Sequence, residues 1–391
     1  MAAAPPAKVA VVGAGLAGAA CSSQLAVQGT SVSLFDMGGR GPGGRTSTRR
    51  QSGYQFDHGC QYIQPAQDNR LQDLFKHWQD QGALAEWKGS FGIVDQSNRK
   101  YRKEEERALL VGKPSMDSLV QHLAAQQGIQ QHWAFKVQRL EQLKDGQWLV
   151  HGLQRHPGDD PDDPRTEGPF NAVLLADILT CQGGVGSVDL GLDAAEKLLH
   201  PVGKASNKAP CFSLMAALHV GSQEAGIAAA SVTGCDSLQW IACDTSKPGR
   251  ERSDGAHCWV AVSTEAFARE TLSAANGKPD MDAVSQQLLE KLCEALKTIN
   301  PDLTAAQLEA NFKATQRWGS GFKAECHPKP YIWDADLGIG ATGDFCIASS
   351  ALQAITNGVV LADAVSGKPS QVGSTAAAAQ HSSKPADVLR W

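Results

Sequence analysis

The N-terminal residues alternate between apolar runs and glycine turns in the order of a strand–helix–strand unit. Lys8–Val12 is a β-branched run that enters a glycine turn, and Leu16–Gln28 has helical patterning closed by Gly29. Ser31–Phe35 alternates apolar and polar residues like a half-buried strand and ends on Asp36. This pattern predicts a βαβ unit.

Three later segments have helical patterning, and several shorter ones have strand patterning. The expected helices are one capped by Ser115 and stopped by Gly128, one from Asp280 or Asp282 through Ile299, and one capped by Ser349 or Ser350 and ending at Gly367. The expected strands are Phe135–Leu140, Gln147–Leu153, Phe170–Ala176, Cys211–Val220, Ser237–Asp244, His257–Ser263 and a stretch near Leu337–Ala341. The polar segment Arg155–Pro169 holds four prolines and is predicted to be a solvated loop between strands. Elements of both kinds predict an α/β protein.

Composition narrows the classes of function. The chain has 391 residues, of which 42% are hydrophobic and 20% charged, and its net charge of −5 argues against a nucleic-acid partner. Its best apolar runs, such as Phe212–Leu218, are too short to cross a bilayer. The ten cysteines are scattered without zinc spacing, so we expect no metal and a soluble protein in a reducing compartment, either cytoplasm or plastid stroma. The partner predicted is a small-molecule substrate, and no oligomeric state is indicated.

The segment Val9–Gly18, VAVVGAGLAG, is a strand that runs directly into GxGxxG. In this motif Gly13 permits a tight turn, Gly15 lets the backbone approach a pyrophosphate, and Gly18 lets the helix close on the sheet. Asp36 stands at the end of the second strand, where a carboxylate accepts hydrogen bonds from the ribose of a dinucleotide. A glycine loop used only for packing would not explain Asp36.

Two further elements favour FAD over NAD. Gly41–Arg45 is a second glycine loop that could lie beside the same pyrophosphate, with Arg45 offsetting the phosphate charge. The alternative for this loop is a surface turn with a solvated arginine. Gly343-Asp344 precedes a helix that starts near Ala351; Asp344 could accept a bond from a ribityl chain, and the helix N-terminus would stabilise a reduced flavin.

These segments, together with Phe56–Ile63 (FDHGCQYI), Arg40–Arg50 (RGPGGRTSTRR) and Trp240–Arg250 (WIACDTSKPGR), resemble the renalase-like branch of the FAD-dependent amine oxidase superfamily. The bacterial and plastid-type members are the most similar. The resemblance spans about residues 8–365 and is strongest in the cofactor half. It implies a Rossmann-like FAD-binding domain of the GR2 type and a second α+β domain with a mostly antiparallel sheet over the flavin. We expect the FAD-binding domain in 1–65, 112–180 and 325–367, the substrate domain in 66–111 and 181–324, and a disordered tail in 368–391.

The resemblance also implies a set of cofactor contacts. Val137 would be a backbone partner of the adenine, and Asp344 with the Gln353 turn would hold the ribityl chain and flavin. The complete set expected at FAD is Gly13, Ala14, Gly15, Leu16, Ala17, Gly18, Asp36, Met37, Gly43, Gly44, Arg45, His58, Gly59, Cys60, Gln61, Tyr62, Val137, Gly343, Asp344, Gln353 and Ala354.

The reaction implied is hydride transfer from a small organic substrate, a dihydronicotinamide or an amine, to the flavin, with O2 as the acceptor. No catalytic dyad is evident, and Asp57-His58 is interpreted as a loop-structuring or flavin-edge pair. Tyr62, Trp240 and Trp318 are the substrate-pocket candidates; core packing is the alternative for each.

The substrate half departs from the family pattern. Val262 replaces a family histidine, and Arg317-Trp318-Gly319 replaces Arg-Trp-Arg. Asp177–Gln182 and Phe345–Ala351 also differ from the family pattern. These departures leave a second hypothesis open, in which the chain binds FAD through a degenerate substrate pocket and acts as a sensor, scaffold or assembly factor.

Overall fold

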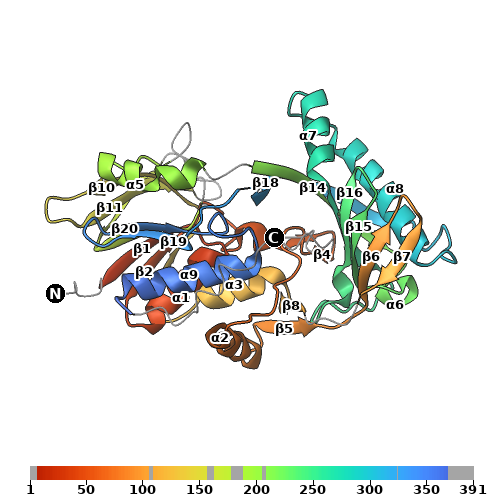
Figure 1. Ribbon diagram of the computed structural model, residues 1–391, viewed down its shortest axis with the longest axis horizontal. Coiled ribbons are helices and arrows are strands. Elements are labelled where there is room, and N and C mark those ends of the chain that lie inside the picture. The colour runs from red at the N-terminus through yellow and green to blue at the C-terminus, as the bar shows by residue number, and fades with distance from the viewer. Residues whose placement is uncertain are drawn as a thin grey trace.

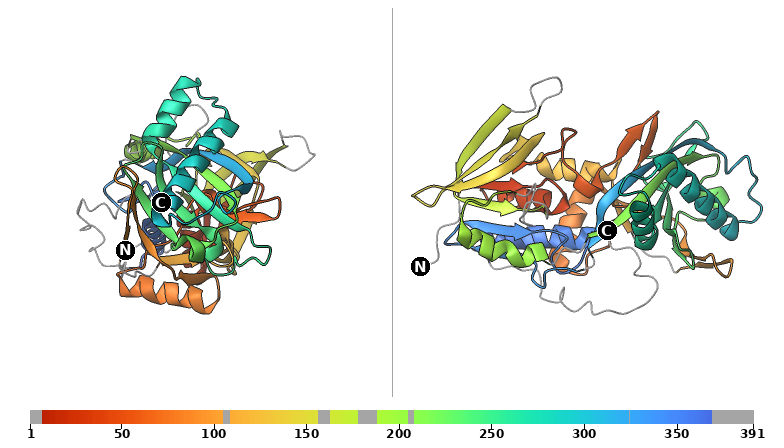
Figure 2. Two further views of the ribbon diagram at one scale, coloured as in Figure 1. Left: turned by 90° about the vertical axis from the view of Figure 1, so that its right-hand side faces the viewer. Right: turned by 90° about the horizontal axis from the view of Figure 1, so that it is seen from above.

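The computed structural model describes residues 7–104, 109–155, 163–177, 188–204, 208–323 and 325–368. Two sheets organise these residues, one at each end of the molecule (Figure 1). The long strands β14 (Lys208–Leu218) and β18 (Ala310–Lys323) belong to the second sheet and reach toward the first (Figures 1 and 2). The expected disordered tail lies outside the described residues, apart from Lys368.

The first sheet has the order β19-β20-β13-β1-β2-β9. All its pairings are parallel except that of the edge strand β19 with β20. Its central strands are buried almost throughout, as expected for a parallel sheet covered on both faces. The six strands are β1 (Lys8–Val12), β2 (Ser31–Phe35), β9 (Ile129–His132), β13 (Ala172–Leu175), β19 (Tyr331–Asp334) and β20 (Ile339–Thr342).

Three helices gather on one face of this sheet: α1 (Leu16–Val27), α3 (Met116–Ala124) and α9 (Ala351–Val365) (Figure 1). The predicted βαβ unit is confirmed. The predicted caps also hold at α9, where the Ser350 side chain accepts a bond from the backbone N–H of Gln353 (3.1 Å). Helix α9 packs closely on α1. The close approach is evident at Gly358, where an added Cβ would lie 2.3 Å from the carbonyl oxygen of Ala17.

The other face carries a three-stranded sheet, β10 (Phe135–Gln142), β11 (Trp148–Gln154) and β12 (Asp163–Phe170), and helix α5 (Asp193–Lys204). The loop predicted over Arg155–Pro169 is therefore wrong from Asp163 onward. Strand β12 pairs only with β11, and an edge position tolerates the prolines that the sequence pattern attributes to a loop.

The predicted strand Phe170–Ala176 is also wrong at its start, because Phe170 ends β12. Asn171 separates β12 from β13 and forms two hydrogen bonds with the backbone of Lys8. These bonds turn the chain from the outer sheet into the parallel one.

The second sheet has the order β18-β14-β17-β16-β15-β6-β7 and is antiparallel except between β15 and β6. Helices α7 (Glu265–Ala274) and α8 (Met281–Ile299) cover its outer face, and its inner face contributes to a hydrophobic cluster shared with α1 and α3. The predicted strands in 211–220, 237–244 and 257–263 are present as β14, β16 (Leu238–Cys243) and β17 (His257–Ser263), and the predicted α8 is confirmed. Strands β6 (Phe91–Asp95), β7 (Lys100–Lys103), β15 (Ala229–Thr233) and β18 had no predicted counterpart.

The remaining described elements lie between the two sheets or join strands of the second sheet. They are η1 (Gly44–Thr46), β3 (Arg49–Gln51), β4 (Tyr54–Phe56), α2 (Asn69–Asp80), β5 (Leu84–Trp87), β8 (Leu109–Gly112), α6 (Ser222–Ala225) and η2 (Asp244–Ser246). The domain division given above remains a proposal, although α5 shares a hydrophobic cluster with the first sheet and favours a boundary after residue 204. Within the described ranges, no helix combines the length and hydropathy needed to span a bilayer.

Candidate functional site

A cavity of about 440 Å³ opens where the carboxyl ends of the first sheet's parallel strands meet β18 and the start of α9. This edge of a doubly wound sheet is the usual place for a ligand. The cavity is lined by Gly13, Gly15, Leu16, Ala17, Asp36, Met37, Gly43, Gly44, Arg45, Thr46, Cys60, Ala176, Asp177, Trp318, Ser320, Asp344, Ser350, Ala351 and Ala354. Segments that are distant in the sequence therefore share one surface.

The three motif glycines each have a distinct steric reason. Gly13 has a positive φ of 103°, which favours glycine, and an added Cβ there would lie 2.9 Å from that of Asp177. A Cβ on Gly18 would lie 1.9 Å from the Gly13 carbonyl oxygen, so only glycine lets α1 approach the strand. A Cβ on Gly15 would meet no atom within 4 Å, although this residue lines the cavity. Gly15 therefore leaves room for a ligand, whereas the other two serve packing.

Asp36 is fixed by backbone donors on both sides. Its Oδ2 accepts a bond from the Ala14 N–H (2.8 Å), and its Oδ1 accepts one from the Gly38 N–H (2.7 Å). Burial raises the pKa of Asp36, and the two backbone bonds oppose that rise. Each oxygen keeps a further lone pair that can accept a ligand hydroxyl. Met37, 53% exposed, lies beside it at the cavity.

Arg45 and Asp344 form an ion pair at the cavity wall, with an Nη2–Oδ1 distance of 2.5 Å. Arg45 Nη1 also donates to the Gly321 carbonyl oxygen on β18 (3.2 Å), and Ser349 Oγ donates to Asp344 Oδ2 (3.0 Å). The Arg45 guanidinium thus links the glycine loop after β2 to strand β18 and to Asp344, which follows β20. The two side chains retain 29% and 11% exposure, so both remain available to a ligand in the cavity.

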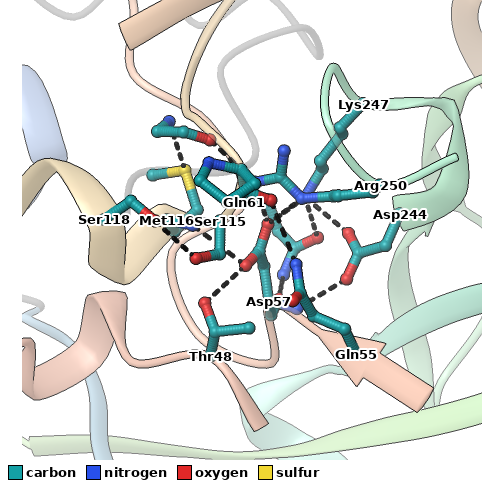
Figure 3. Close-up of polar contacts among 12 residues, drawn as sticks. Thr48, Gln55, Asp57, Gln61, Ser115, Met116, Ser118, Asp244, Lys247 and Arg250 are labelled. Atoms are coloured by element: carbon teal, nitrogen blue, oxygen red, sulfur yellow. Dashed lines mark hydrogen bonds and ion pairs between the residues drawn. The ribbon is translucent and has the colours of Figure 1, made fainter. Parts of the chain in front are cut away.

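Asp57 is the centre of a buried polar network under the segment that carries Cys60 (Figure 3). Arg250 donates to Asp57 Oδ2 through Nη2 (2.6 Å) and Nε (3.0 Å), and Lys247 Nζ lies 3.4 Å from the same oxygen. Thr48 Oγ1 (2.7 Å) and the Met116 N–H (3.1 Å) donate to Oδ1. One carboxylate therefore joins the segment before β3, the first residue of α3 and the segment after β16.

A second carboxylate, Asp244, completes the charge balance of this network. It accepts the Asp57 backbone N–H at 2.6 Å and lies 2.5 Å from Lys247 Nζ. Burial raises the pKa of Asp244 to about 6 against the opposing effect of Lys247, whereas Arg250 and Lys247 overcome the effect of burial on Asp57 and hold its pKa well below the usual value. Two carboxylates and two cations without exposed side-chain surface fix the chain around residues 57–61.

The residues expected at FAD divide into those that line the cavity and those that do not. Of the expected set, the liners are Gly13, Gly15, Leu16, Ala17, Asp36, Met37, Gly43, Gly44, Arg45, Cys60, Asp344 and Ala354. The other expected residues do not line the cavity: Ala14, Gly18, His58, Gly59, Gln61, Tyr62, Val137, Gly343 and Gln353. Several of these have packing roles, since a Cβ on Gly59 would lie 1.9 Å from the Arg45 carbonyl oxygen and one on Gly343 would meet the Phe345 ring at 2.3 Å.

The three aromatic candidates are placed differently. Trp318 lines the cavity, packs on His58 with ring centroids 5.2 Å apart, and donates from Nε1 to the His58 carbonyl oxygen (2.9 Å). Tyr62 and Trp240 pack on each other (5.7 Å) on the inner face of the second sheet and do not line the cavity. Their role as substrate-pocket residues remains a prediction.

Four cavity residues were not singled out by the sequence analysis: Thr46, Ala176, Asp177 and Ser320. Ser350 and Ala351 also line the cavity, at the start of the helix whose N-terminus was expected at the flavin. Asp177 could have been found, because it follows a buried strand parallel to β1 and must lie at the same sheet edge as Gly13. Ser320 could not, because β18 was not predicted.

Comparison with known proteins supports this description of the fold. Residues 11–78 match the family model of an NAD(P)-binding Rossmann-like domain. A putative protoporphyrinogen oxidase from Exiguobacterium sp. 255-15 is similar with a TM-score of 0.61 and 11% identity, over 94% of this chain and 99% of that one. An oxidoreductase from Methanosarcina mazei gives 0.64 and 11%, over 90% and 99%. Wild-type putrescine oxidase bound to putrescine gives 0.58 and 12%, over 92% and 98%.

At these identities the similarity defines the fold. It is a Rossmann-like dinucleotide-binding fold joined to an antiparallel sheet, as in amine-oxidase-type proteins, and the predicted fold class is confirmed.

Proposed function

We propose that the chain is an FAD-dependent oxidoreductase of the amine oxidase superfamily, in its renalase-like branch. The main support is the cavity, because its wall combines the open Gly15 turn, Asp36, the Arg45 loop, and Asp344 with the start of α9. An extended dinucleotide needs contacts at all of these points, whereas a short ligand needs few of them. Similarity to solved oxidases over nearly the whole chain agrees with this assignment.

The residues present fit FAD. The open space at Gly15 and the N-terminus of α1 would receive the diphosphate, and the carboxylate of Asp36 would accept the ribose hydroxyls. Asp344 would accept a hydroxyl of the ribityl chain, with Arg45 balancing charge beside it. The α9 N-terminus at Ala351 would stabilise negative charge on a reduced flavin.

When bound, FAD accepts a hydride from a small organic substrate, here a dihydronicotinamide or an amine, and passes the electrons to O2. The chain's own contribution is to position and to exclude water. Trp318 and Cys60 would border the reacting end of the cavity, and the Asp57 network holds the Cys60 segment in place. No described residue needs to act as a general base in such a hydride transfer.

An FAD-binding protein without turnover is the second candidate. Val262 favours it, because this fully buried valine lies at the sheet centre where the family resemblance places a histidine. A sensor, scaffold or assembly factor could keep the cofactor site and lose the polar groups that face the flavin.

Rapid-mixing absorbance separates the two functions. The purified protein should be yellow, and a panel of dihydronicotinamides and amines should contain a compound that bleaches the flavin band, which O2 then restores. If dithionite bleaches the band but no member of the panel does, turnover with these substrates is excluded. A folded protein without affinity for FAD would refute both candidates.

A further inference from the structure

The inner face of the second sheet carries a transverse row of residues directly beside the cavity. On neighbouring strands, Gln316 pairs with Ser213, Ser213 with Val262, and Val262 with Trp240. Direct partners share one face of a sheet, and Val262 and Trp240 belong to the cluster that faces α1. Trp318 and Ser320, which line the cavity, follow Gln316 along β18 on the same face. The row is thus adjacent to the cavity's inner end.

Buried polar atoms without a hydrogen-bond partner gather at this row. Among the described residues, Ser213 Oγ and Trp240 Nε1 lack a partner, and so do Arg49 Nε and His58 Nδ1 from the facing segment. Arg49 is tied to the row because its Nη2 donates to Gln316 Oε1 at 2.7 Å. Buried polar groups are normally bonded, so four unpartnered atoms along one row and the segment bonded to it are candidate contacts for a ligand.

The hydrogen-bonding character of these atoms selects the ligand's chemistry. The Arg49 guanidinium and the Trp240 indole N–H can only donate, and Ser213 can donate as well as accept. Burial and the neighbouring Arg49 lower the pKa of His58 to about 4, so His58 is neutral near pH 7 and Arg49 is the cation. These groups suit an acceptor that carries negative charge.

Three carboxylates near this region are already paired. Asp57 is paired with Arg250, Asp244 with Lys247, and Asp344 with Arg45. An ammonium substrate would therefore have to compete with an existing cation for each of them, and it would also face Arg49. A substrate carboxylate would neither compete with these cations nor be repelled by Arg49.

We propose that the row Ser213–Val262–Trp240, with Arg49 and His58, is the substrate subsite, and that it binds a planar substrate through a carboxylate. This inference rests on the proposed function and assigns its small organic substrate to the carboxylates, in place of the amine or dihydronicotinamide that the family resemblance implies. Two partly exposed aromatic rings cover the subsite: Tyr62 lies on Trp240 and Trp318 on His58. Because the unpartnered atoms are closed to solvent, the proposal requires that one of these rings turn aside to admit the substrate.

The test uses the FAD-loaded protein and two probes of equal shape and opposite charge, benzoate and benzylammonium. FAD content is measured first, and binding is then followed by the perturbation of the flavin spectrum at constant ionic strength. Benzoate should bind at least about tenfold more tightly than benzylammonium, and Trp240→Phe and Ser213→Ala should each weaken benzoate binding roughly five- to tenfold with FAD content unchanged. Trp133→Phe is the matched control, because that indole donates to Gln131 on β9 and does not line the cavity.

Tighter binding of benzylammonium, its oxidation by the enzyme, or the absence of any benzoate binding would overturn the inference. So would benzoate affinity that is the same in Trp240→Phe, Ser213→Ala and the wild type. In each of these cases a full FAD content would leave the cofactor assignment standing. A protein without FAD would instead refute the proposed function, and the subsite with it.

Discussion

Replacing Gly15 by valine adds a branched side chain to the cavity without disturbing the fold. The backbone at Gly15 is extended, with φ −77° and ψ −175°, a conformation that valine adopts readily. The added Cβ meets no protein atom within 4 Å, and valine is a poorer N-cap of α1 than glycine, so we expect the unfolding free energy to fall by no more than about 1 kcal/mol.

The effect on FAD should be large, because the new side chain would occupy the path of the diphosphate. Losing two backbone N–H bonds to a charged phosphate costs about 1.5–3 kcal/mol each, which corresponds to affinity at least roughly 100-fold weaker. The assay combines the flavin-to-protein absorbance ratio of the purified variant with a fluorescence titration of the apoprotein by FAD.

Gly319→Val is the matched control for this experiment. Gly319 also has open space around its Cβ, but it is exposed on β18 between two cavity residues and faces the other way. It should retain FAD. A Gly15→Val protein that is fully yellow, or a Gly319→Val protein that loses FAD equally, would refute the placement of the diphosphate.

Two further predictions concern the buried charges. Arg250→Met should lower the unfolding free energy by about 3–5 kcal/mol in urea denaturation, because it leaves Asp57 buried without its main partner. Arg165→Gln, which breaks an exposed pair, should cost less than about 1 kcal/mol; equal losses would contradict the role given to burial. His58, whose pKa is lowered to about 4, stays neutral in the folded state while the unfolded state takes up a proton below pH 6.5. The contribution of His58 to the unfolding free energy is therefore most favourable above pH 6.5, and the unfolding free energy falls by up to about 2–3 kcal/mol as the pH falls to 4. His58→Asn should flatten that part of the stability–pH curve, and a curve parallel to the wild type's would show that His58 is not the group responsible.

The parts of the fold that the sequence predicts are those with local signals. The turn from β1 into α1, the caps of α8 and α9, and three of the seven strands of the second sheet (β14, β16 and β17) follow from patterning over a few residues. Strand β18 escaped because its inward residues include polar ones that line the cavity or pair with neighbours, such as Gln316 and Ser320. Its apolar residues Phe312, Ala314 and Trp318 are therefore interrupted on the same face, which weakens the alternation on which strand prediction depends.

The candidate site was predictable where a motif carries it and unpredictable where distant segments meet. Gly15, Asp36 and Arg45 stand in motifs whose spacing indicates their place. Nothing local in the sequence indicates that Asp57 meets Arg250, because 193 residues separate them. Neighbouring residues also diverge: Asp57 points into the ion network, whereas His58 packs on Trp318.

The close packing of α9 against α1 has a consequence for biosynthesis. A ribosome makes the N-terminal βαβ unit first, yet Asp344, Ser350 and Ala351 form part of the same cavity wall. The nascent chain therefore lacks one side of its binding site until residues 344–351 have been made. Cofactor capture then has to follow the synthesis of this segment, and a chain that terminates before residue 343 should remain colourless even if its first domain begins to fold.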